Sequence, residues 1–227
     1  NSFISTFAYQ ISREKNVNLM NPNKKLRLIY IDDLVNNLVS VQNRKNLSKV
    51  NFKYTNITNT TPLSVLKLLK LFHQNDKENI ITNFSNLFVK KLYSTYLYYM
   101  PRRLVTQKIH NNTDHRGTFA EFLKLGKYGQ LSYFSILPGK IRGGHYHNTK
   151  TEKFLLIDGS VKFNFKELYT GKKYSIKISE KNNKIITTVP GWIHDIVNSS
   201  NKTAKLVVWA NEVFSKKKPD TYSASMK

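Results

Sequence analysis

Four residues in the second half of the sequence have the types and spacing of metal ligands: His145, His147, Glu152 and His194. Alternate residues of a β-strand point to the same face, so the two imidazoles of H-Y-H lie together. Glu152 then reaches the same point from beyond a bend, and His194 reaches it from a later strand. Three imidazoles and one carboxylate suit a borderline divalent metal such as zinc, iron or nickel. The sequence therefore predicts a metal-centred pocket within an all-β domain.

The elements that must position these ligands are short strands. From about Phe119 onward, alternating hydrophobic segments are separated by turn signals such as Pro138-Gly139, Asp158-Gly159 and Pro190-Gly191. This pattern predicts a sandwich or small barrel. The expected strands cover 131–137, 153–157, 161–168, 172–178, 185–189 and 206–211.

The first half of the sequence has a different pattern, with hydrophobic residues mostly at helical spacing. We expect a helix from about Phe3, a short strand over 26–30, and a helix that Asp32 or Asp33 caps. Two more helices are expected, one from Thr61-Pro62 to about Phe72 and one over 87–100. Residues 101–113 are polar and read as a linker, so we expect one domain over 1–104 and another over 105–227.

Composition excludes several classes of protein. The 227 residues are 40% hydrophobic, which favours a globular chain of one or two domains. Cysteine is absent, so a disulfide framework is excluded. No apolar run approaches the ~20 residues that span a bilayer, and the first residues do not resemble a signal peptide. We therefore expect a cytoplasmic protein without a membrane partner.

The formal net charge of +23 suggests nucleic-acid binding only at first sight. Residues 1–108 carry +12 and residues 109–227 carry +11, so the excess is spread evenly over the chain. An even lysine-rich surface favours solubility and a general attraction to anions. We expect no nucleic-acid partner, while the phosphates of a nucleotide sugar remain a plausible ligand.

The segment from Gly139 to Gly159 reads G-x5-H-x-H-x4-E-x6-G. It resembles the first motif of the cupins at every fixed position. Pro190, Gly191, His194 and Asn198 resemble the second cupin motif, with the proline shifted by one position. The resemblance implies a jelly-roll barrel whose metal ligands are the four residues named above.

Flanking residues narrow the resemblance. The segment 114–121 reads D-x-R-G-x-F-x-E, and Arg142 opens an R-G-x-H segment. Both are similar to segments of the dTDP-4-dehydrorhamnose 3,5-epimerase group, in which the histidine of R-G-x-H serves as the base. Here that residue is His145, which would also be a metal ligand, so the identity of the base stays open between His145, Glu121 and Tyr146.

The whole chain resembles the C-terminal part of a bifunctional capsular-polysaccharide enzyme family, a short-chain dehydrogenase/reductase fused to a cupin. The resemblance is carried by 1–13, 28–38, 86–101, 114–122, 143–159 and 207–222. It implies an α+β chain overall, with a mostly helical remnant of an extended reductase domain followed by an all-β cupin (jelly-roll) barrel. It also implies a homodimer and a UDP-sugar substrate on the route to N-acetyl-L-fucosamine.

No G-x-x-G-x-x-G loop occurs in the sequence. We therefore expect the reductase half of this chain to lack its NADPH site, with NADPH used only by a full-length form. The remaining reaction is epimerisation at C-3 of a UDP-4-keto-6-deoxy-HexNAc, with a divalent metal, zinc for preference. The resemblance implies catalytic roles for His145, Arg142, Lys153 and Glu121, and substrate-binding roles for Arg116, Lys140 and Trp192.

Two other functions use the same ligands. A metal-dependent cupin dioxygenase would keep open positions on the metal for oxygen. A non-catalytic sugar-binding cupin would need no base. Zinc in the site disfavours oxygen chemistry, whereas iron with oxygen uptake would contradict the epimerase interpretation.

Overall fold

The computed structural model describes residues 2–42, 54–182 and 184–227. The chain divides into two compact units, which are described separately. The first unit comprises Asn1–Glu78 with Thr82–Gln107, and the second comprises Asn79–Ile81 with Lys108–Lys227. The predicted domain over 1–104 includes residue 1 and residues 43–53, which lie outside the described residues. It also includes Asn79–Ile81, which belong to the second unit because Ile80 pairs with Lys124 as an isolated β-bridge.

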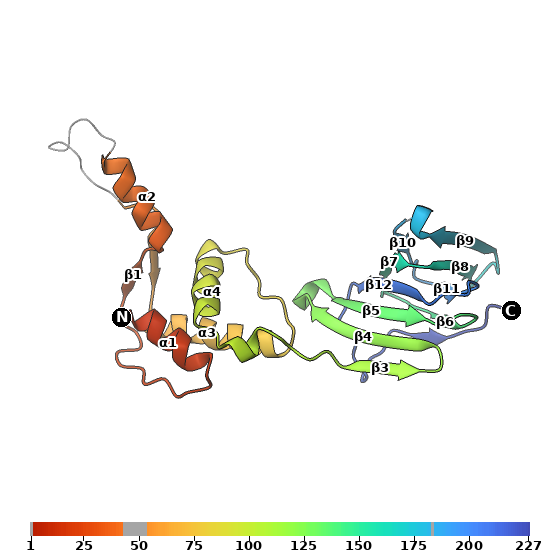
Figure 1. Ribbon diagram of the computed structural model, residues 1–227, viewed down its shortest axis with the longest axis horizontal. Coiled ribbons are helices and arrows are strands. Elements are labelled where there is room, and N and C mark those ends of the chain that lie inside the picture. Colours follow the sequence, from red (N-terminus) through yellow and green to blue (C-terminus); the bar gives the residue numbers. More distant parts are fainter. Residues whose placement is uncertain (1, 43–53, 183) are drawn as a thin grey trace. The chain divides into compact units, whose positions relative to one another are not determined.

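The first unit is mainly helical (Figure 1). Side chains cap three of its helices, as an N-cap requires: Ser2 accepts from the Ser5 amide, Thr61 from Ser64, and Asn86 from Phe88. Two short antiparallel strands form a ribbon beside the helices. The elements are α1 (Phe3–Ile11), β1 (Leu26–Leu28), α2 (Ile31–Gln42), β2 (Thr58–Thr60), α3 (Pro62–Lys77), α4 (Leu87–Tyr99) and η2 (Arg102–Leu104).

Apolar faces of α1, α3 and α4 form the core of this unit. Phe72, Leu69 and Tyr96 are fully buried there, and the rings of Phe72 and Tyr96 lie 6.0 Å apart. The predicted cap of α2 is wrong in detail. The helix begins at Ile31, so Asp32 and Asp33 lie in its first turn. Carboxylates at this end still stabilise the helix, because they interact favourably with the positive end of its dipole.

The second unit consists of two antiparallel sheets, and Figure 1 labels their strands from β3 to β12. The six-stranded sheet has the order β10-β7-β12-β5-β4-β3, and the five-stranded sheet has the order β13-β6-β11-β8-β9. The strands are β3 (Asn111–Asp114), β4 (Gly117–Lys124), β5 (Gln130–Ile136), β6 (Ile141–Tyr146), β7 (Glu152–Asp158), β8 (Ser160–Glu167), β9 (Lys173–Ser179), β10 (Ile186–Thr187), β11 (Trp192–Val197), β12 (Ala204–Ala210) and β13 (Tyr222–Ser223). The short helices η3 (Gly126–Tyr128) and η4 (Glu180–Asn182) join strands.

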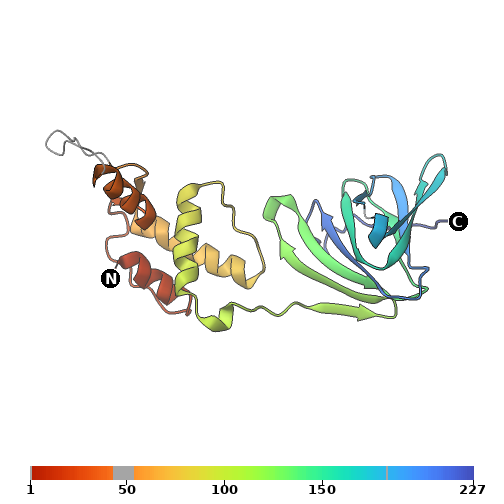
Figure 2. The same ribbon diagram turned by 45° about the horizontal axis from the view of Figure 1, so that its top comes forward.

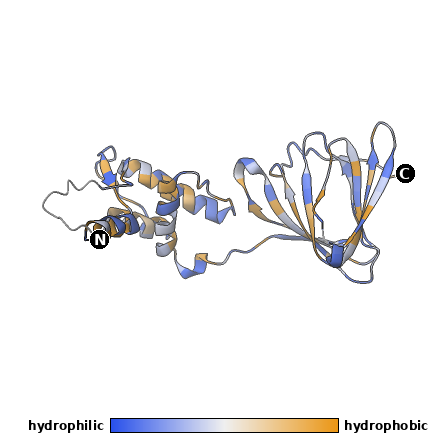
Figure 3. Ribbon diagram, turned by 90° about the horizontal axis from the view of Figure 1, so that it is seen from above, coloured by the Kyte–Doolittle hydropathy of each residue, from blue (hydrophilic) through white to orange (hydrophobic). Residues whose placement is uncertain are grey.

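The two sheets face each other across one hydrophobic core (Figure 2). Phe134, Leu156 and Leu206 enter it from the six-stranded sheet, and Phe163 and Ile196 enter it from the five-stranded sheet. Hydrophobic and hydrophilic residues alternate along the strands, as one buried face requires (Figure 3). This two-sheet arrangement confirms a cupin-like β fold.

The predicted linker over 101–113 is partly wrong, because β3 occupies its end and pairs with β4. All four β3 residues are exposed, so this edge strand carries no hydrophobic alternation that would reveal it in the sequence. Among the described residues, no helix has the length and apolar character needed to cross a membrane.

Candidate metal centre

The four predicted ligands come together inside the second unit. His145 lies on β6, Glu152 opens β7, His194 lies on β11, and His147 follows the end of β6. The register pairs His194 directly with His145. One donor atom from each of the four residues can be chosen so that all lie within 4.8 Å of one another. The residue types and this spacing fit a four-ligand divalent metal site.

A glycine permits the close approach of the two histidine strands. The β6–β11 pairing is irregular between His194 and Asp195, where a β-bulge changes the register. Gly143 has a φ of +101°, and a Cβ there would lie 2.6 Å from the carbonyl oxygen of His194. The first glycine of the R-G-x-H segment is therefore required by packing, because any side chain there would push β6 and β11 apart.

The carboxylate of Glu152 lies between two imidazoles. Its Oε2 atom is 3.3 Å from His147 Nε2 and 3.4 Å from His194 Nε2. The ring of His145 lies 4.9 Å from that of His147 and 4.7 Å from that of His194. His147 and His194 are almost fully buried, yet His147 Nε2 and His194 Nδ1 have no hydrogen-bond partner. Buried nitrogens without partners are costly unless another ligand satisfies them, so the cluster fits a metal ion.

Electrostatics favour the ligand forms of these side chains. Burial, together with the neighbouring His194 and His147, lowers the pKa of His145 to about 3. The imidazole is therefore neutral at physiological pH. Burial alone would raise the pKa of Glu152, but the contact from His194 and the ammonium of Lys150 hold this pKa well below its usual range. A neutral imidazole beside an ionised carboxylate is the state that binds a metal.

A hollow of about 200 Å³ borders the ligand cluster, and two guanidinium groups line it. Arg116 donates to Asp114 through Nε at 3.0 Å and Nη2 at 2.6 Å, which holds the pKa of Asp114 below its usual range. Arg142 donates from Nε to the carbonyl of Ser135 at 2.9 Å, while its buried Nη2 has no hydrogen-bond partner. The hollow is lined by Arg116, Phe119, Phe134, Arg142, Gly143, His145, Glu152, Phe154, His194, Ile196 and Val208.

A smaller hollow of about 90 Å³ lies on another side of Glu152. Glu121, predicted as a catalytic residue, lines it together with Glu212 and Lys150. Lys150 Nζ is 3.8 Å from Glu152 Oε1 and largely buried. Sequence reasoning missed Lys150, because it stands in a bend between strands where alternation assigns no face. Its only signal was its place inside the H-x-H-x4-E segment.

Four residues that the sequence suggested for catalysis or substrate binding lie outside both hollows. Lys153 is exposed on β7 and donates to Thr187 Oγ1 at 3.1 Å, because residues next to Glu152 point to the opposite face. Lys140 is exposed in the turn before β6. Trp192 packs against the core and meets the ring of Tyr174 edge-on at 5.5 Å. Tyr146 stacks on Tyr222 at 5.2 Å, away from the hollow.

The asparagine of the second motif has a structural role. Asn198 is fully buried, and its Nδ2 donates to the carbonyls of Ile136 and Lys202, each at 2.8 Å. Its Oδ1 accepts from the amide and the hydroxyl of Ser200 at 3.0 and 2.7 Å. The side chain thus closes the turn between β11 and β12.

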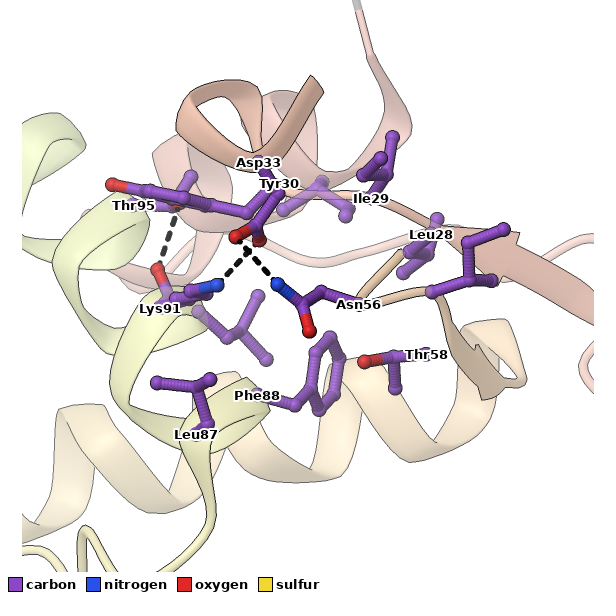
Figure 4. A pocket seen from close by; sticks show the side chains of 13 residues that line it. Leu28, Ile29, Tyr30, Asp33, Asn56, Thr58, Leu87, Phe88, Lys91 and Thr95 are labelled. Carbon is purple, nitrogen blue, oxygen red and sulfur yellow. Dashed lines mark hydrogen bonds and ion pairs between the residues drawn. The ribbon is translucent and has the colours of Figure 1, made fainter. Parts of the chain in front are cut away.

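The first unit has a pocket of its own, shown in Figure 4. Lys91 forms an ion pair with Asp33, and Asn56 Nδ2 donates to Asp33 Oδ1 at 3.1 Å. The ammonium also lies 5.4 Å from the centre of the Tyr30 ring. The hydrogen bond from Lys91 lowers the pKa of Asp33. The ion pair between Asp33 on α2 and Lys91 on α4 therefore links these two helices.

The fold and the donor set define a cupin-type β domain with a candidate metal centre. Residues 112–222 match the family described as the polysaccharide biosynthesis C-terminal domain. This part of the chain is thus similar to that domain, and the whole chain resembles the C-terminal part of a longer, bifunctional capsular-polysaccharide enzyme.

Two kinds of relative cover almost the whole chain. A UDP-2-acetamido-2,6-beta-L-arabino-hexul-4-ose reductase of Pseudomonas aeruginosa is 36% identical over 226 residues, which are 100% of this chain and 61% of the relative. The crystal structure of the capsular polysaccharide assembling protein CapF from Staphylococcus aureus matches with a TM-score of 0.91 and 31% identity, over 99% of this chain and 61% of that one. CapF with the inhibitor 3-isopropenyl-tropolone matches with a TM-score of 0.90, 31% identity, and coverage of 99% and 65%. The chain thus spans less than two thirds of these relatives.

Proposed function

We propose that the second unit catalyses metal-dependent epimerisation at C-3 of a UDP-4-keto-6-deoxy-HexNAc for capsule or O-antigen sugar biosynthesis. One observation carries the proposal: three of the four donors share a hollow with two guanidinium groups. The names of the relatives support a nucleotide-sugar substrate.

The reaction removes a proton next to a ketone, so negative charge develops on the ketone oxygen. A divalent metal, when bound, would polarise that ketone as a Lewis acid. His145, His147, Glu152 and His194 would hold it. Nη2 of Arg142 makes no hydrogen bond and lies 3.6 Å from Asp114 Oδ1 as an ion pair, so it can donate to an anionic oxygen, and Arg116 at the same hollow suits the diphosphate.

We assign the base to Glu121. His145 is a weak proton acceptor with a pKa of about 3 and is occupied as a ligand. Glu121 and Lys150 both line the hollow of about 90 Å³ that borders Glu152. The Glu121 carboxylate would take the proton from the sugar, and the Lys150 ammonium or a water would supply a proton to the enolate.

The first unit is proposed to be the C-terminal part of a reductase domain, because the Pseudomonas aeruginosa relative, which spans this whole chain, bears the name of a reductase. NADPH would then be used by a longer form that carries the dinucleotide loop. A homodimer and the lack of a nucleic-acid partner remain predictions.

The test is wash-in of deuterium at C-3 of a UDP-4-keto-6-deoxy-HexNAc, followed by NMR with and without a chelator. Arg142→Met should slow the exchange by about 100-fold or more, the size of losing one preorganised donor. Lys153→Met, which removes an ammonium outside the hollow, is the matched control and should leave exchange unchanged.

Exchange that survives both chelation and His194→Ala would contradict the metal-dependent reaction. Bound iron with uptake of oxygen would favour the dioxygenase alternative, and binding of the sugar without exchange would favour the sugar-binding one.

A further inference from the structure

The candidate ligand His147 is hydrogen-bonded on its second ring nitrogen by the segment that follows β12. Nδ1 of His147 lies 2.5 Å from the carbonyl oxygen of Asp220. A carbonyl only accepts hydrogen bonds, so the proton of the neutral ring must be on Nδ1. Nε2 is then the free lone pair, and this is the atom that lies 3.3 Å from Glu152 Oε2.

The carboxylate of the same residue holds the bend between the ligands. Asp220 Oδ1 accepts from the amide of Asn148 at 2.9 Å, and Oδ2 accepts from the amides of Thr149 and Lys150, each at 2.7 Å. The hydroxyl of Thr149 donates to Oδ2 at 2.9 Å. These groups begin one residue after His147 and end two residues before Glu152. One aspartate therefore fixes the path between two ligands.

The residues after Asp220 are attached to the sheet. Tyr222 pairs with Tyr146, and Ser223 pairs with His145. The amide of Ala224 donates to the carbonyl of Gly144 at 3.0 Å. We call residues 219–224 the strap. Because it adds a strand at the edge of β6, it is anchored on the backbone of a ligand strand and can hold Asp220 in place.

We propose that Asp220 is a positioning residue of the metal centre, which sets the tautomer of His147 through its carbonyl and the ligand bend through its carboxylate. The inference rests on the metal centre proposed above. A partner on the second nitrogen of a ligating histidine orients the ring and raises its basicity, and its loss costs about 10- to 100-fold in metal affinity.

The first measurement is the affinity for Zn²⁺, by competition with a chromophoric chelator. Asp220→Ala should weaken Zn²⁺ binding by about 10- to 100-fold, whereas Asp220→Asn, which keeps one acceptor oxygen, should recover part of the loss. Asp158→Ala is the matched control, since Asp158 pairs with Lys205 at 2.9 Å on the surface of the same unit. It should bind Zn²⁺ as the wild type does.

The second measurement needs no metal. Long-range ¹H–¹⁵N NMR of the metal-free protein should show His147 protonated on Nδ1 in the wild type and also in Asp220→Ala, because this substitution keeps the backbone carbonyl. Ala224→Pro removes the amide that holds the strap to the carbonyl of Gly144, and it should give a mixture of His147 tautomers. Thr149→Val, which removes only the hydroxyl donor, serves if Asp220→Ala fails to fold, and it should weaken Zn²⁺ binding by a smaller factor.

Unchanged affinity in folded Asp220→Ala would overturn the role of the carboxylate, and an unchanged tautomer in folded Ala224→Pro would overturn the role of the carbonyl. A wild type that binds no Zn²⁺ but loses the Nδ1 tautomer in Ala224→Pro would contradict the metal centre while supporting the positioning role. The two proposals can therefore fail separately.

Discussion

At the scale of single residues, the folding stability of the metal-free protein should depend on pH through the partly buried His145. His145 has a folded-state pKa of about 3 against an ordinary pKa of 6.5, so the unfolded chain binds a proton in this interval and the folded chain does not. Stability from this residue is present above pH 6.5 and is lost as the pH falls toward 3. Glu152 also has a lowered pKa, but its contribution is lost at lower pH, from the ordinary pKa of a carboxyl group downward.

We therefore expect the free energy of unfolding of the chelator-treated protein to fall by about 1 kcal/mol between pH 7 and 5.5 because of His145. Urea unfolding at several pH values measures this slope. In His145→Gln the slope should be smaller by that amount. Identical slopes in the two proteins would show that burial does not hold this imidazole neutral.

The clustering of the four candidate ligands could be predicted from the sequence because motif spacing and strand alternation together fix which side chains meet. Motif spacing and strand alternation did not support the roles expected of Lys140 and Trp192. Those roles rest on the resemblance alone, and both residues lie outside the hollows. Lys150 and Asp220 were not predictable, since one lies in a bend and the other is 68 residues from Glu152 in the sequence. Only the fold brings them together.

At the scale of elements, the β6–β11 pairing depends on the space at Gly143. Gly143→Ala should lower the affinity for Zn²⁺ and destabilise the second unit by more than about 1 kcal/mol, because the new Cβ meets the His194 backbone. Gly171→Ala is the control. Gly171 has a φ of +71°, but a Cβ there would meet nothing within 4 Å, so this variant reports the backbone strain alone.

Metal titration and urea unfolding of the two glycine variants separate the effects. Equal losses in both variants would mean that positive φ, and not the contact with β11, decides the cost.

The turn from β11 to β12 depends on Asn198. Asn198→Ala removes four hydrogen bonds from a fully buried site and should cost about 1–3 kcal/mol in the free energy of unfolding. Affinity for Zn²⁺ should change little in the folded variant, because Asn198 touches none of the ligands. The exposed Asn201 provides the control Asn201→Ala. A large loss of affinity in folded Asn198→Ala would assign the motif asparagine to the site.

Most helices and strands were predictable because their hydrophobic residues repeat with the period of the element. The helix over 87–100 is observed as α4 over Leu87–Tyr99, and the strand over 131–137 as β5 over Gln130–Ile136. The edge strands β3 and β13 were not predictable. Their residues are exposed, so backbone pairing and not a hydrophobic pattern defines them.

At the scale of the whole molecule, the two units differ in the spectroscopic signals by which their unfolding can be followed. All four candidate metal ligands and both tryptophans lie in the second unit, whereas every described α-helix lies in the first. Saturation at about 100 times the dissociation constant should stabilise the ligand-bearing unit by about 2.7 kcal/mol. Tryptophan fluorescence should therefore show a higher unfolding midpoint with Zn²⁺, while the helical circular dichroism signal at 222 nm should not shift. Parallel shifts of both signals would show that the two units unfold together.

The hydrogen bond from His147 to Asp220 also has a consequence for synthesis. A ribosome makes the chain from the N-terminus, so all four ligands leave the exit tunnel before Asp220 does. For that interval the imidazole of His147 lacks its partner and both tautomers are accessible. An ion captured during translation would meet a looser set of ligands than the finished chain presents, so metal selection is expected to be completed after the strap has been added to the edge of β6.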